Sequence, residues 1–469
     1  MRPSIFLLAL ALFANAILCQ GSPSSDGKIK NFLYIISDDL KTSSLGCYGN
    51  EFCKTPNIDR LAKASMRFTR AYCQGTVCRP SRISIMSSRY LDKKAGQHIT
   101  FPQHFKKQGW YSARVSKIFH MPIPGAIVRG DSGTDHPESW SEFYNFKAKE
   151  AHTDGAYACL NKNIFTTGME GRETTGEPNR MFVSVKMTGD GSDQPDPMAA
   201  NQAIELLRKH KDSPFLLAVG FVRPHYPMVT PEKYFTLYPH KKMKMPETRQ
   251  GDWDDIPKAG ISRSNSKSTG LDQYPENQKR MLSAYYASVS FMDTQLGKLM
   301  AELDRLGLRE STAIVFTSDH GYHLGDHEFW QKANLHEEVT NVPLMISVPG
   351  FKPGISSSLV ELADIFPTFT ELAGIDTPES CHGLSLVPIL KDPSHSIRKY
   401  AFSYDKKNHS LRSDQWAYIS YGKAGADGEE LYDMEKDRKQ FTNLAKNPKY
   451  QEILEEHRQA LKNKLAAIR

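Results

Sequence analysis

The chain has 469 residues, which is enough for one large α/β domain and a smaller one. Hydrophobic residues make up 39% and charged residues 24%, as is typical of an ordinary soluble globular protein. The formal net charge of +7 suits an anionic substrate. Because the basic residues are spread along the chain and form no stripe, we expect no nucleic-acid partner.

The first 19 residues predict a signal peptide. Arg2 supplies a positive charge, residues 5–19 form a short apolar run, and residues 14–16 (Ala-Asn-Ala) match a cleavage site. The alternative is a buried helix of the fold. No other segment reaches about 18 uninterrupted apolar residues, so we expect no membrane span. The sequence therefore predicts an exported protein, secreted, periplasmic or lumenal.

Seven cysteines occur, and Cys19 leaves with the signal peptide or lies beside its cleavage point. An exported chain could form disulfides, and Cys47 and Cys53 are close enough to close a small loop. Spacing does not reveal the connectivity. If Cys78 has a chemical role of its own, five cysteines remain and at least one of them stays unpaired.

Four short apolar runs end abruptly in polar residues, and they lie at residues 32–36, 215–219, 313–316 and 342–348. Continuous apolar runs of this length are typical of strands buried on both faces of a parallel sheet. Helical patterns lie between them, for example at 199–210 and 285–306. The alternation predicts an α/β domain over residues 27–393, with a large doubly wound, mixed but mostly parallel sheet flanked by helices.

The character of the chain changes after about residue 394. Residues 400–404, 415–421 and 430–434 predict short antiparallel strands, and residues 450–468 predict a closing helix. We therefore place a small C-terminal α+β subdomain at 394–469. Two segments of the larger domain, 121–191 and 251–273, have weak periodicity and predict surface decoration.

Polar, chemistry-bearing residues follow the apolar runs. In doubly wound sheets ligands bind beyond the carboxyl ends of the strands, so residues placed there converge even when far apart in sequence. The residues that the pattern places at strand ends are Asp38, Asp39, His225, Asp319 and His320.

The run Cys78-Arg79-Pro80-Ser81-Arg82, followed by Met86-Ser87-Ser88-Arg89, resembles the signature of the sulfatase family, in the alkaline phosphatase-like superfamily. The resemblance implies that Cys78 is oxidised to formylglycine, whose geminal diol is a nucleophile that later collapses back to the aldehyde. Arg82, one helical turn on, would steady the diol anion and the sulfate. The alternative is a structural cysteine beside a turn. Ser88 stands where the family usually has glycine.

Adjacent acids at a strand end are costly unless they are paired with cations. The resemblance implies one divalent cation per chain, held by Asp38, Asp39, Asp319, His320 and the modified Cys78. The oxygen-rich ligand set indicates Ca²⁺, while the imidazole keeps a transition metal open. The alternative is that Asp38 and Asp39 form a turn or a helix cap.

Three further motifs resemble the family's catalytic groups. Lys117 would hold the sulfate and His120 would take a proton during release of the product. His225, in Arg-Pro-His-Tyr-Pro, would protonate the leaving alcohol, and Lys332 would bind a sulfate oxygen. For each of these the alternative is an ordinary structural or solvated side chain. Weaker candidates for recognising another anionic group of the substrate are Arg79, Arg223 and His323.

Within the family, the sequence is most similar to iduronate-2-sulfatases. The supporting stretches are residues 45–49, 55–59, 117–120, 215–227, 286–293, 317–325, 431–433 and 443–445. The resemblance implies a sulfuric ester hydrolase that removes the 2-O-sulfate of iduronate, or of a related uronic acid or sugar, from sulfated polysaccharides or oligosaccharides. It also implies a formylglycine-generating enzyme as a partner during maturation. Loops at 121–187 and 241–278 match poorly, and such loops shape specificity.

Three alternatives stay open. The first is a phosphonate or phosphate ester hydrolase of the same superfamily. The second is a sulfatase that acts on algal galactan or ulvan-type polysaccharides. The third is a catalytically inactive protein that binds anionic polysaccharides, which would follow if Cys78 is never oxidised.

Overall fold

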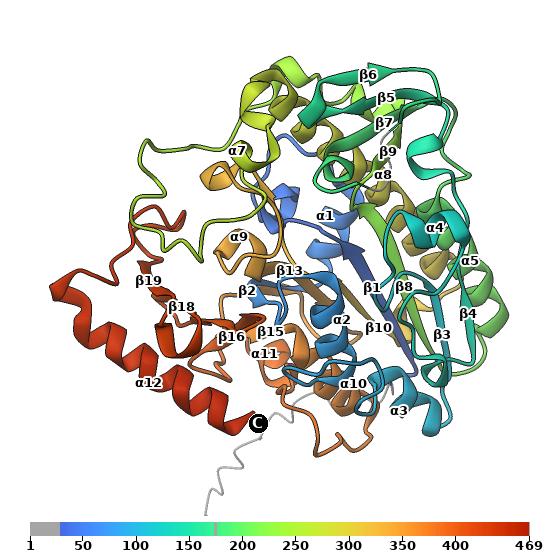
Figure 1. Ribbon diagram of the computed structural model, residues 1–469. Coiled ribbons are helices and arrows are strands. Elements are labelled where there is room, and N and C mark those ends of the chain that lie inside the picture. The colour runs from blue at the N-terminus through green and yellow to red at the C-terminus, as the bar shows by residue number, and fades with distance from the viewer. Residues whose placement is uncertain (1–28, 173–175, 469) are drawn as a thin grey trace, which may run out of the picture.

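The computed structural model describes residues 29–172 and 176–468, so the predicted signal peptide lies outside the described residues (Figure 1). A nine-stranded sheet forms the centre of the described chain, in the order β14-β2-β13-β10-β1-β8-β3-β4, and β15 also pairs with β2. The bounds are β1 (Asn31–Asp38), β2 (Met66–Tyr72), β3 (Tyr111–Ser116), β4 (Glu142–Tyr144), β8 (Phe215–Pro224), β10 (Thr312–Ser318), β13 (Asn341–Ser347), β14 (Gly354–Ser356) and β15 (Val360–Glu361).

The sheet is mostly parallel, as the sequence predicted. β1 pairs in parallel with both β8 and β10, so that Ile35 lies beside Val219 on one side and Phe316 on the other. β13 runs antiparallel to β10 and to β2, which makes the sheet mixed. All four predicted apolar runs are strands of this sheet.

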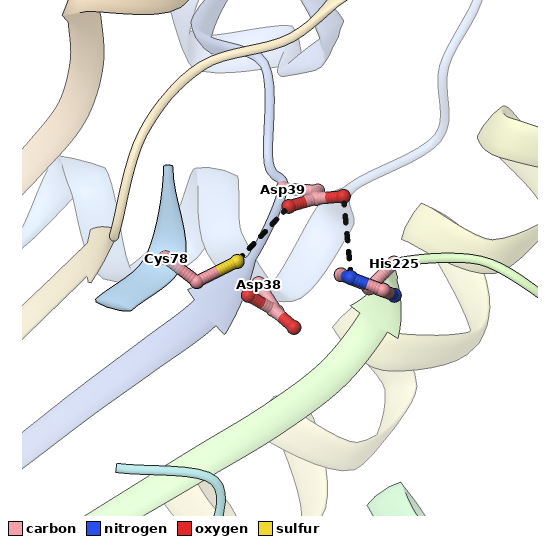
Figure 2. Close-up of side chains that lie close together, drawn as sticks. All are labelled: Asp38, Asp39, Cys78 and His225. Carbon is pink, nitrogen blue, oxygen red and sulfur yellow. Dashed lines mark hydrogen bonds and ion pairs between the residues drawn. The ribbon is translucent and has the colours of Figure 1, made fainter. Parts of the chain in front are cut away.

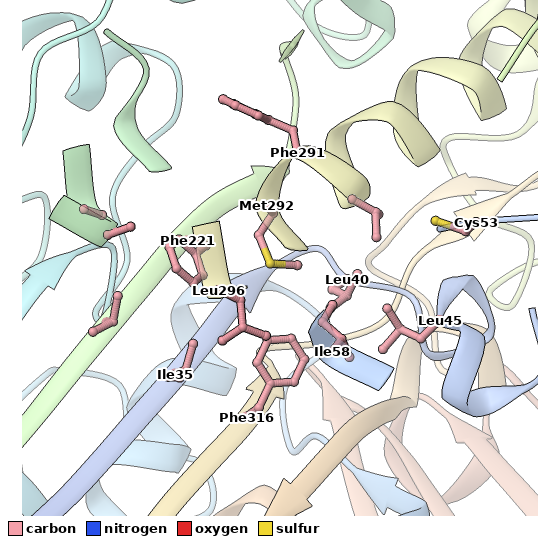
Figure 3. Close-up of a cluster of buried hydrophobic side chains, with 14 of the residues drawn as sticks. Ile35, Leu40, Leu45, Cys53, Ile58, Phe221, Phe291, Met292, Leu296 and Phe316 are labelled. Carbon is pink, nitrogen blue, oxygen red and sulfur yellow. The ribbon is translucent and has the colours of Figure 1, made fainter. Parts of the chain in front are cut away.

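Helices cover both faces of the sheet (Figure 1). Leu33 and Ile35 point into one hydrophobic core with α1 (Pro56–Lys63), α5 (Pro195–His210) and α8 (Pro275–Arg305). Figure 3 shows this core, with Ile35 beside α8 side chains such as Leu296. Phe32 and Tyr34 point the opposite way, into a core with α2 (Cys78–Ser87), α3 (Phe101–Lys107), α10 (Ile365–Ala373) and α11 (Val387–Lys391). This alternation explains why the strands are apolar throughout.

The segment that the sequence assigned only to surface decoration contains regular structure. Three of its strands join β9 (Met228–Pro231) in a second sheet, ordered β6-β5-β7-β9. These strands are β5 (Gly155–Cys159), β6 (Ile164–Thr166) and β7 (Val183–Met187), and they bury a small apolar cluster. Short elements elsewhere are α4 (Gly125–Arg129), α6 (Glu232–Phe235), α7 (Ser266–Thr269), α9 (Glu337–Thr340), β11 (His323–Leu324) and β12 (Trp330–Gln331).

A four-stranded antiparallel sheet lies near the C-terminus, beside the main sheet (Figure 1). Its strands are β16 (Ala401–Asp405), β17 (Asn408–Arg412), β18 (Trp416–Tyr421) and β19 (Gly428–Asp433), and α12 (Gln451–Ala467) packs on it. The sequence predicted three of these strands and the helix but missed β17. His336 Nε2 lies 2.8 Å from Glu430 Oε2 in a buried ion pair that joins this sheet to the larger part of the chain.

The structure also bears on disulfides and on membrane-spanning helices. No disulfide joins cysteines within residues 29–172 and 176–468, so Cys47 and Cys53 do not close the loop that their spacing allowed. Among the described helices, none combines the length and the apolar character that crossing a bilayer requires.

Candidate active site

The ends of three neighbouring strands bring the predicted polar residues together. Asp38 ends β1 and Asp39 follows it, Asp319 and His320 follow β10, and His225 follows β8. The four carboxylate and imidazole groups at the ends of β1 and β10 are fully buried, and His225 is 4% exposed. Figure 2 shows Asp38, Asp39 and His225 converging on Cys78.

The turn after β1 aims the two aspartates at the same point. Asp39 has a left-handed backbone with φ of 62°, which is rare for residues other than glycine. The Tyr285 hydroxyl of α8 donates a 2.6 Å hydrogen bond to the Asp39 carbonyl, and the Lys41 amide donates to that hydroxyl at 2.8 Å. The Asp39 amide donates to Asp319 Oδ1 at 3.2 Å. These bonds hold the unusual conformation in place.

Cys78 is the first residue of α2 and is 4% exposed. Its Sγ lies 3.2 Å from Lys332 Nζ, 3.3 Å from His320 Nε2 and 3.8 Å from Asp39 Oδ1. Burial, and then the charge of Asp38, raise the pKa of the Cys78 thiol well above its ordinary value. The unmodified side chain is therefore a neutral thiol, a form that is a poor nucleophile.

Arg82 lies one turn further along α2 and is fully buried. Its guanidinium donates to Asp319 Oδ2 at 2.8 Å and to Asp38 Oδ1 at 3.0 Å. Its Nη1 donates to the carbonyls of Lys117 at 2.6 Å and Ile118 at 2.9 Å. The Lys117 ammonium pairs with Asp38 Oδ2. Burial alone would raise the pKa of Asp38, but Lys117, followed by His225 and Arg82, lowers it well below its ordinary value. Asp38 is therefore a carboxylate.

The donor set fits a divalent cation. Ligand atoms of Asp38, Asp39, Cys78 and His225 lie within 4.8 Å of one another, as do those of Cys78, Asp319 and His320. Asp39 Oδ2 is buried and accepts no hydrogen bond from the described residues, which leaves a carboxylate oxygen for a metal. Carboxylate oxygens favour Ca²⁺, and an imidazole nitrogen also suits transition metals.

His225 and His320 both direct Nε2 toward the carboxylates of the site. His320 Nδ1 lies 3.0 Å from the Gly321 carbonyl, and His225 Nδ1 lies 2.6 Å from the Tyr226 carbonyl. A carbonyl accepts only from a protonated nitrogen, so Nδ1 carries a hydrogen in each ring and Nε2 is the nitrogen that faces the carboxylates.

His120 lies at the edge of the same cluster, beyond the end of β3. Burial, and then the charge of Lys117, lower the pKa of His120 to about 3. Its Nδ1 is buried without a hydrogen-bond partner among the described residues. His120 is therefore neutral near pH 7, with one ring nitrogen unpaired among the described residues.

Two of the three weaker candidates for binding the substrate are buried against other residues of the protein. Arg223 is fully buried, its guanidinium binds Glu150 at 3.2 Å, and it donates to the His225 carbonyl at 3.3 Å. It therefore supports the loop that carries His225, and burial keeps its guanidinium away from solvent. His323 is also fully buried, 3.3 Å from Asn334 Oδ1 and packed on the Phe329 ring. Arg79, in contrast, is exposed beside Cys78.

Two residues of the site were missed by sequence reasoning. The Tyr226 ring lies 5.8 Å from Lys332 Nζ and 6.0 Å from the Arg180 guanidinium carbon. Tyr226 directly follows His225, so its place in that motif was a usable signal. Arg180 lies in the weakly periodic segment before β7, where no motif marked it.

A buried cluster of carboxylates and imidazoles at the ends of parallel strands, with lysines and a helix-start cysteine around it, defines an ester hydrolase of the alkaline phosphatase-like fold. Residues 30–375 match the sulfatase family model, and residues 325–467 match the model for the C-terminal part of N-sulphoglucosamine sulphohydrolase. The chain belongs to the sulfatase family and is a sulfuric ester hydrolase similar to iduronate 2-sulfatases.

The similarity extends over most of each relative. Iduronate 2-sulfatase of Homo sapiens is 32% identical, over 88% of this chain and 82% of the relative. A sulfatase of Formosa agariphila is also 32% identical, over 91% of this chain and 85% of the relative. Among solved structures, a phosphonate monoester hydrolase from Silicibacter pomeroyi has a TM-score of 0.76 at 20% identity, with 93% and 95% of the two chains covered. A 2-O GAG sulfatase has a TM-score of 0.69 at 22% identity, with 94% and 92% covered. These two likenesses show the shared fold.

Proposed function

We propose that this sulfatase removes the 2-O-sulfate of iduronate or a related uronic acid from sulfated polysaccharides, with formylglycine at position 78 and one bound Ca²⁺. The observation that carries the proposal is the position of Cys78 Sγ, within 3.3 Å of both Lys332 Nζ and His320 Nε2. The similarity to mouse and human iduronate 2-sulfatases supports the choice of sugar.

The state of the thiol supports conversion of Cys78. Its raised pKa keeps the sulfur protonated, so an unmodified side chain would be a weak nucleophile in this pocket. A formylglycine hydrate would supply a nucleophilic oxygen and, by returning to the aldehyde, a route for releasing sulfate. Arg82, fixed by two carboxylates, holds the start of α2 in register with the strand ends.

The cation would be held by Asp38, Asp39, Asp319, His320 and residue 78. When bound it would offset negative charge on the sulfuryl oxygens. Lys117 and Lys332 add two positive charges on opposite sides of this set, one beside Asp38 and one beside Asp39. Together they would bind the sulfuryl group and stabilise the charge that develops on it.

The two outer histidines divide the proton transfers. Burial, followed by the charge of Lys332, lowers the pKa of His225 well below its ordinary value. A sulfate ester bound to Lys332 and Lys117 offsets those positive charges, and this raises the proton affinity of His225. His225 then takes up a proton from solvent on Nε2 and gives it to the leaving sugar oxygen. His120 accepts the proton of the hydroxyl at residue 78 as sulfate is released and the aldehyde forms again.

A substrate panel tests the proposal. The full chain, produced together with a formylglycine-generating enzyme, should release sulfate from 2-O-sulfated uronides faster than from 6-O-sulfated glucosamine or galactan sulfates. It should also prefer an aryl sulfate to an aryl phosphonate ester. The mass of the peptide that contains Cys78 should fall, because a thiol has become an aldehyde, and Cys78→Ala should be folded but inactive. Full activity of Cys78→Ala would rule out the mechanism, and a preference for phosphonates or galactans would rule out the substrate.

A further inference from the structure

A groove of about 640 Å³ lies on the face of α2 next to the one that faces the cation site. Helical geometry separates the two faces, because Cys78 and Arg82 project toward the carboxylates while Arg79 and Ile83 project into the groove. We call this cavity the basic groove. Its lining residues used below are Arg79, Lys93 and Lys406 at the rim and Ile83, Leu91 and Tyr404 on the floor.

The basic groove begins where the two active-site segments meet. Val77 and Arg79, which flank Cys78, line it, and so does Ala333, which follows Lys332. The Ala333 amide donates a 3.1 Å hydrogen bond to the Thr76 carbonyl, so these segments form one continuous wall. A polysaccharide that extends from the sulfuryl site over the start of α2 therefore enters the basic groove directly.

The basic groove has three positively charged side chains that are open to solvent. Arg79, Lys93 and Lys406 are exposed, and within the described ranges none of them forms an ion pair. The lining also contains two carboxylates. Asp92 lies 2.9 Å from His98, and Asp405 lies near enough to Lys406 for their charges to interact. Three cations above an apolar and aromatic floor match a sugar ring that carries anionic substituents.

The backbone gives a second indication. Lys406 and Lys407 form the two-residue turn between β16 and β17, and Lys406 has φ of 55°. Such turns favour glycine or asparagine at a position with positive φ. Leu91, on the floor, also has positive φ, at 66°. Strained backbone that is kept at a concave site is characteristic of function, and here it places a lysine at the rim.

We infer that the basic groove binds the sugar residue next to the one that loses its sulfate, through that neighbour's carboxylate or sulfate group. This inference rests on the proposed function, because it assumes an anionic polysaccharide substrate. An enzyme with such a groove would act on polysaccharides more efficiently than on single sulfated sugars.

The test compares long and short substrates. For the double variant Lys93→Gln/Lys406→Gly, kcat/KM on heparin should fall roughly fivefold to tenfold, as expected for two lost charge-assisted contacts. On a 4-methylumbelliferyl uronide 2-sulfate it should change less than about twofold, because that substrate does not reach the groove. The control Lys407→Gln removes a charge from the same turn but not from the groove lining, and it should match the wild type on both substrates. Equal losses on both substrates, or no loss on heparin, would overturn the inference.

The melting temperature of Lys406→Gly shows whether Lys406 binds the substrate or stabilises the fold. Lys406→Gly relieves the positive φ, so its melting temperature should stay equal or rise while activity on heparin falls. A fall in melting temperature together with activity would indicate a structural role and contradict the inference.

Heparin binding by an inactive protein tests the groove independently of the reaction. Heparin affinity of the Cys78→Ala protein, measured by calorimetry, should fall in the double variant, and N- and 6-O-desulfated heparin should show whether sulfates or carboxylates are bound. If the wild type releases no sulfate from any uronide but the affinity difference persists, the proposed substrate is wrong and the groove remains a polyanion site. If affinity is unchanged in the double variant, the inference about the groove is wrong.

Discussion

Lys332 Nζ lies 3.2 Å from Cys78 Sγ, although 254 positions separate the two residues in the chain. The same ammonium pairs with Asp39 Oδ1, so one side chain contacts both the proposed nucleophile and a predicted metal ligand. Burial alone would lower the pKa of Lys332, but Asp39, and then Cys78, raise it well above its ordinary value. Lys332 is therefore a permanent positive charge at the reacting atoms.

Replacement of Lys332 by glutamine should lower kcat by about 10²-fold, because a preorganised charge beside the sulfuryl oxygens is lost. Circular dichroism should remain that of the wild type, since the side chain lies at the rim of the site. Lys436→Gln, which removes an ammonium that is 75% exposed and paired with Asp433, is the control and should keep full activity. Activity of Lys332→Gln within twofold of the wild type would remove Lys332 from the mechanism.

Removal of divalent metal should lower both activity and the melting temperature. Asp38, Asp39 and Asp319 are fully buried around one point, and a cation that binds only the folded state stabilises it by about 2.7 kcal/mol at 100 times its Kd. Dialysis against EDTA should therefore inactivate the enzyme, and Ca²⁺ should restore it better than Zn²⁺.

The matched variant for this test is Asp39→Asn, which lacks one carboxylate ligand. Its melting temperature should respond less to added Ca²⁺ than that of the wild type. Equal melting curves of the wild type with EDTA and with Ca²⁺ would argue against a cation at these residues.

Ser88 ends α2 with a left-handed backbone, φ 54° and ψ 31°, a conformation that glycine adopts more readily. Its hydroxyl donates to the Ala363 carbonyl at 2.7 Å and accepts from the Gly383 amide at 3.1 Å. Ser88→Ala keeps the strained backbone and loses both bonds, so it should lower the free energy of unfolding by about 2 kcal/mol. Ser88→Gly loses the same bonds but relieves about 1 kcal/mol of strain, so it should be the more stable of the two. Thermal or urea unfolding gives the order, and the reverse order would show that the backbone is not strained.

His382 predicts a pH dependence of stability away from the catalytic groups. Burial, and then the charges of Arg89 and Lys464, lower its pKa to about 4, and its Nδ1 accepts a 3.1 Å hydrogen bond from the Tyr90 amide. The unfolded chain, with a histidine pKa near 6.5, binds more protons than the folded chain between pH 6.5 and 4. The contribution of His382 is therefore complete above pH 6.5 and is lost as the pH falls toward 4.

His382→Asn keeps an acceptor but cannot titrate, so it is the comparison for this effect. Between pH 7 and pH 5 the melting temperature of the wild type should fall more than that of His382→Asn. The free energy of unfolding that the wild type loses beyond His382→Asn should stay below the limit of about 1.4 kcal/mol per pH unit. The ring is partly exposed, so solvent screens its charge. Parallel curves for the two proteins would show that His382 is not responsible.

The main sheet was predictable because its strands are buried on both faces. Residues 32–36 and 313–316 are apolar without interruption, and the polar residues after them marked the strand ends where the site forms. The second sheet was not predictable in the same way, since β5 and β6 are short and β6 is half exposed, so neither has a run that stands out. β17, Asn-His-Ser-Leu-Arg, carries mostly polar side chains and has no strand-like pattern.

The same limit applies within the site. A residue near a strand end is easy to identify, but the direction of its side chain depends on partners far away in the chain. Arg223 turns to Glu150, 73 positions away, and His323 packs against Phe329, and neither partner is marked in the sequence. His225 lies two positions after Arg223, but its ring packs at a tilt against Tyr226 and faces Asp39.

The burial of Cys78 sets an order of events in the life of the protein. The thiol is enclosed by the ends of β1 and β10, by α2 and by the segment of Lys332, and only 4% of the residue is accessible. An oxidising enzyme cannot reach this sulfur once the sheet and helices have closed around it. The conversion proposed for Cys78 would therefore take place on the nascent or unfolded chain, and a molecule that folds first would keep the thiol until it unfolds again.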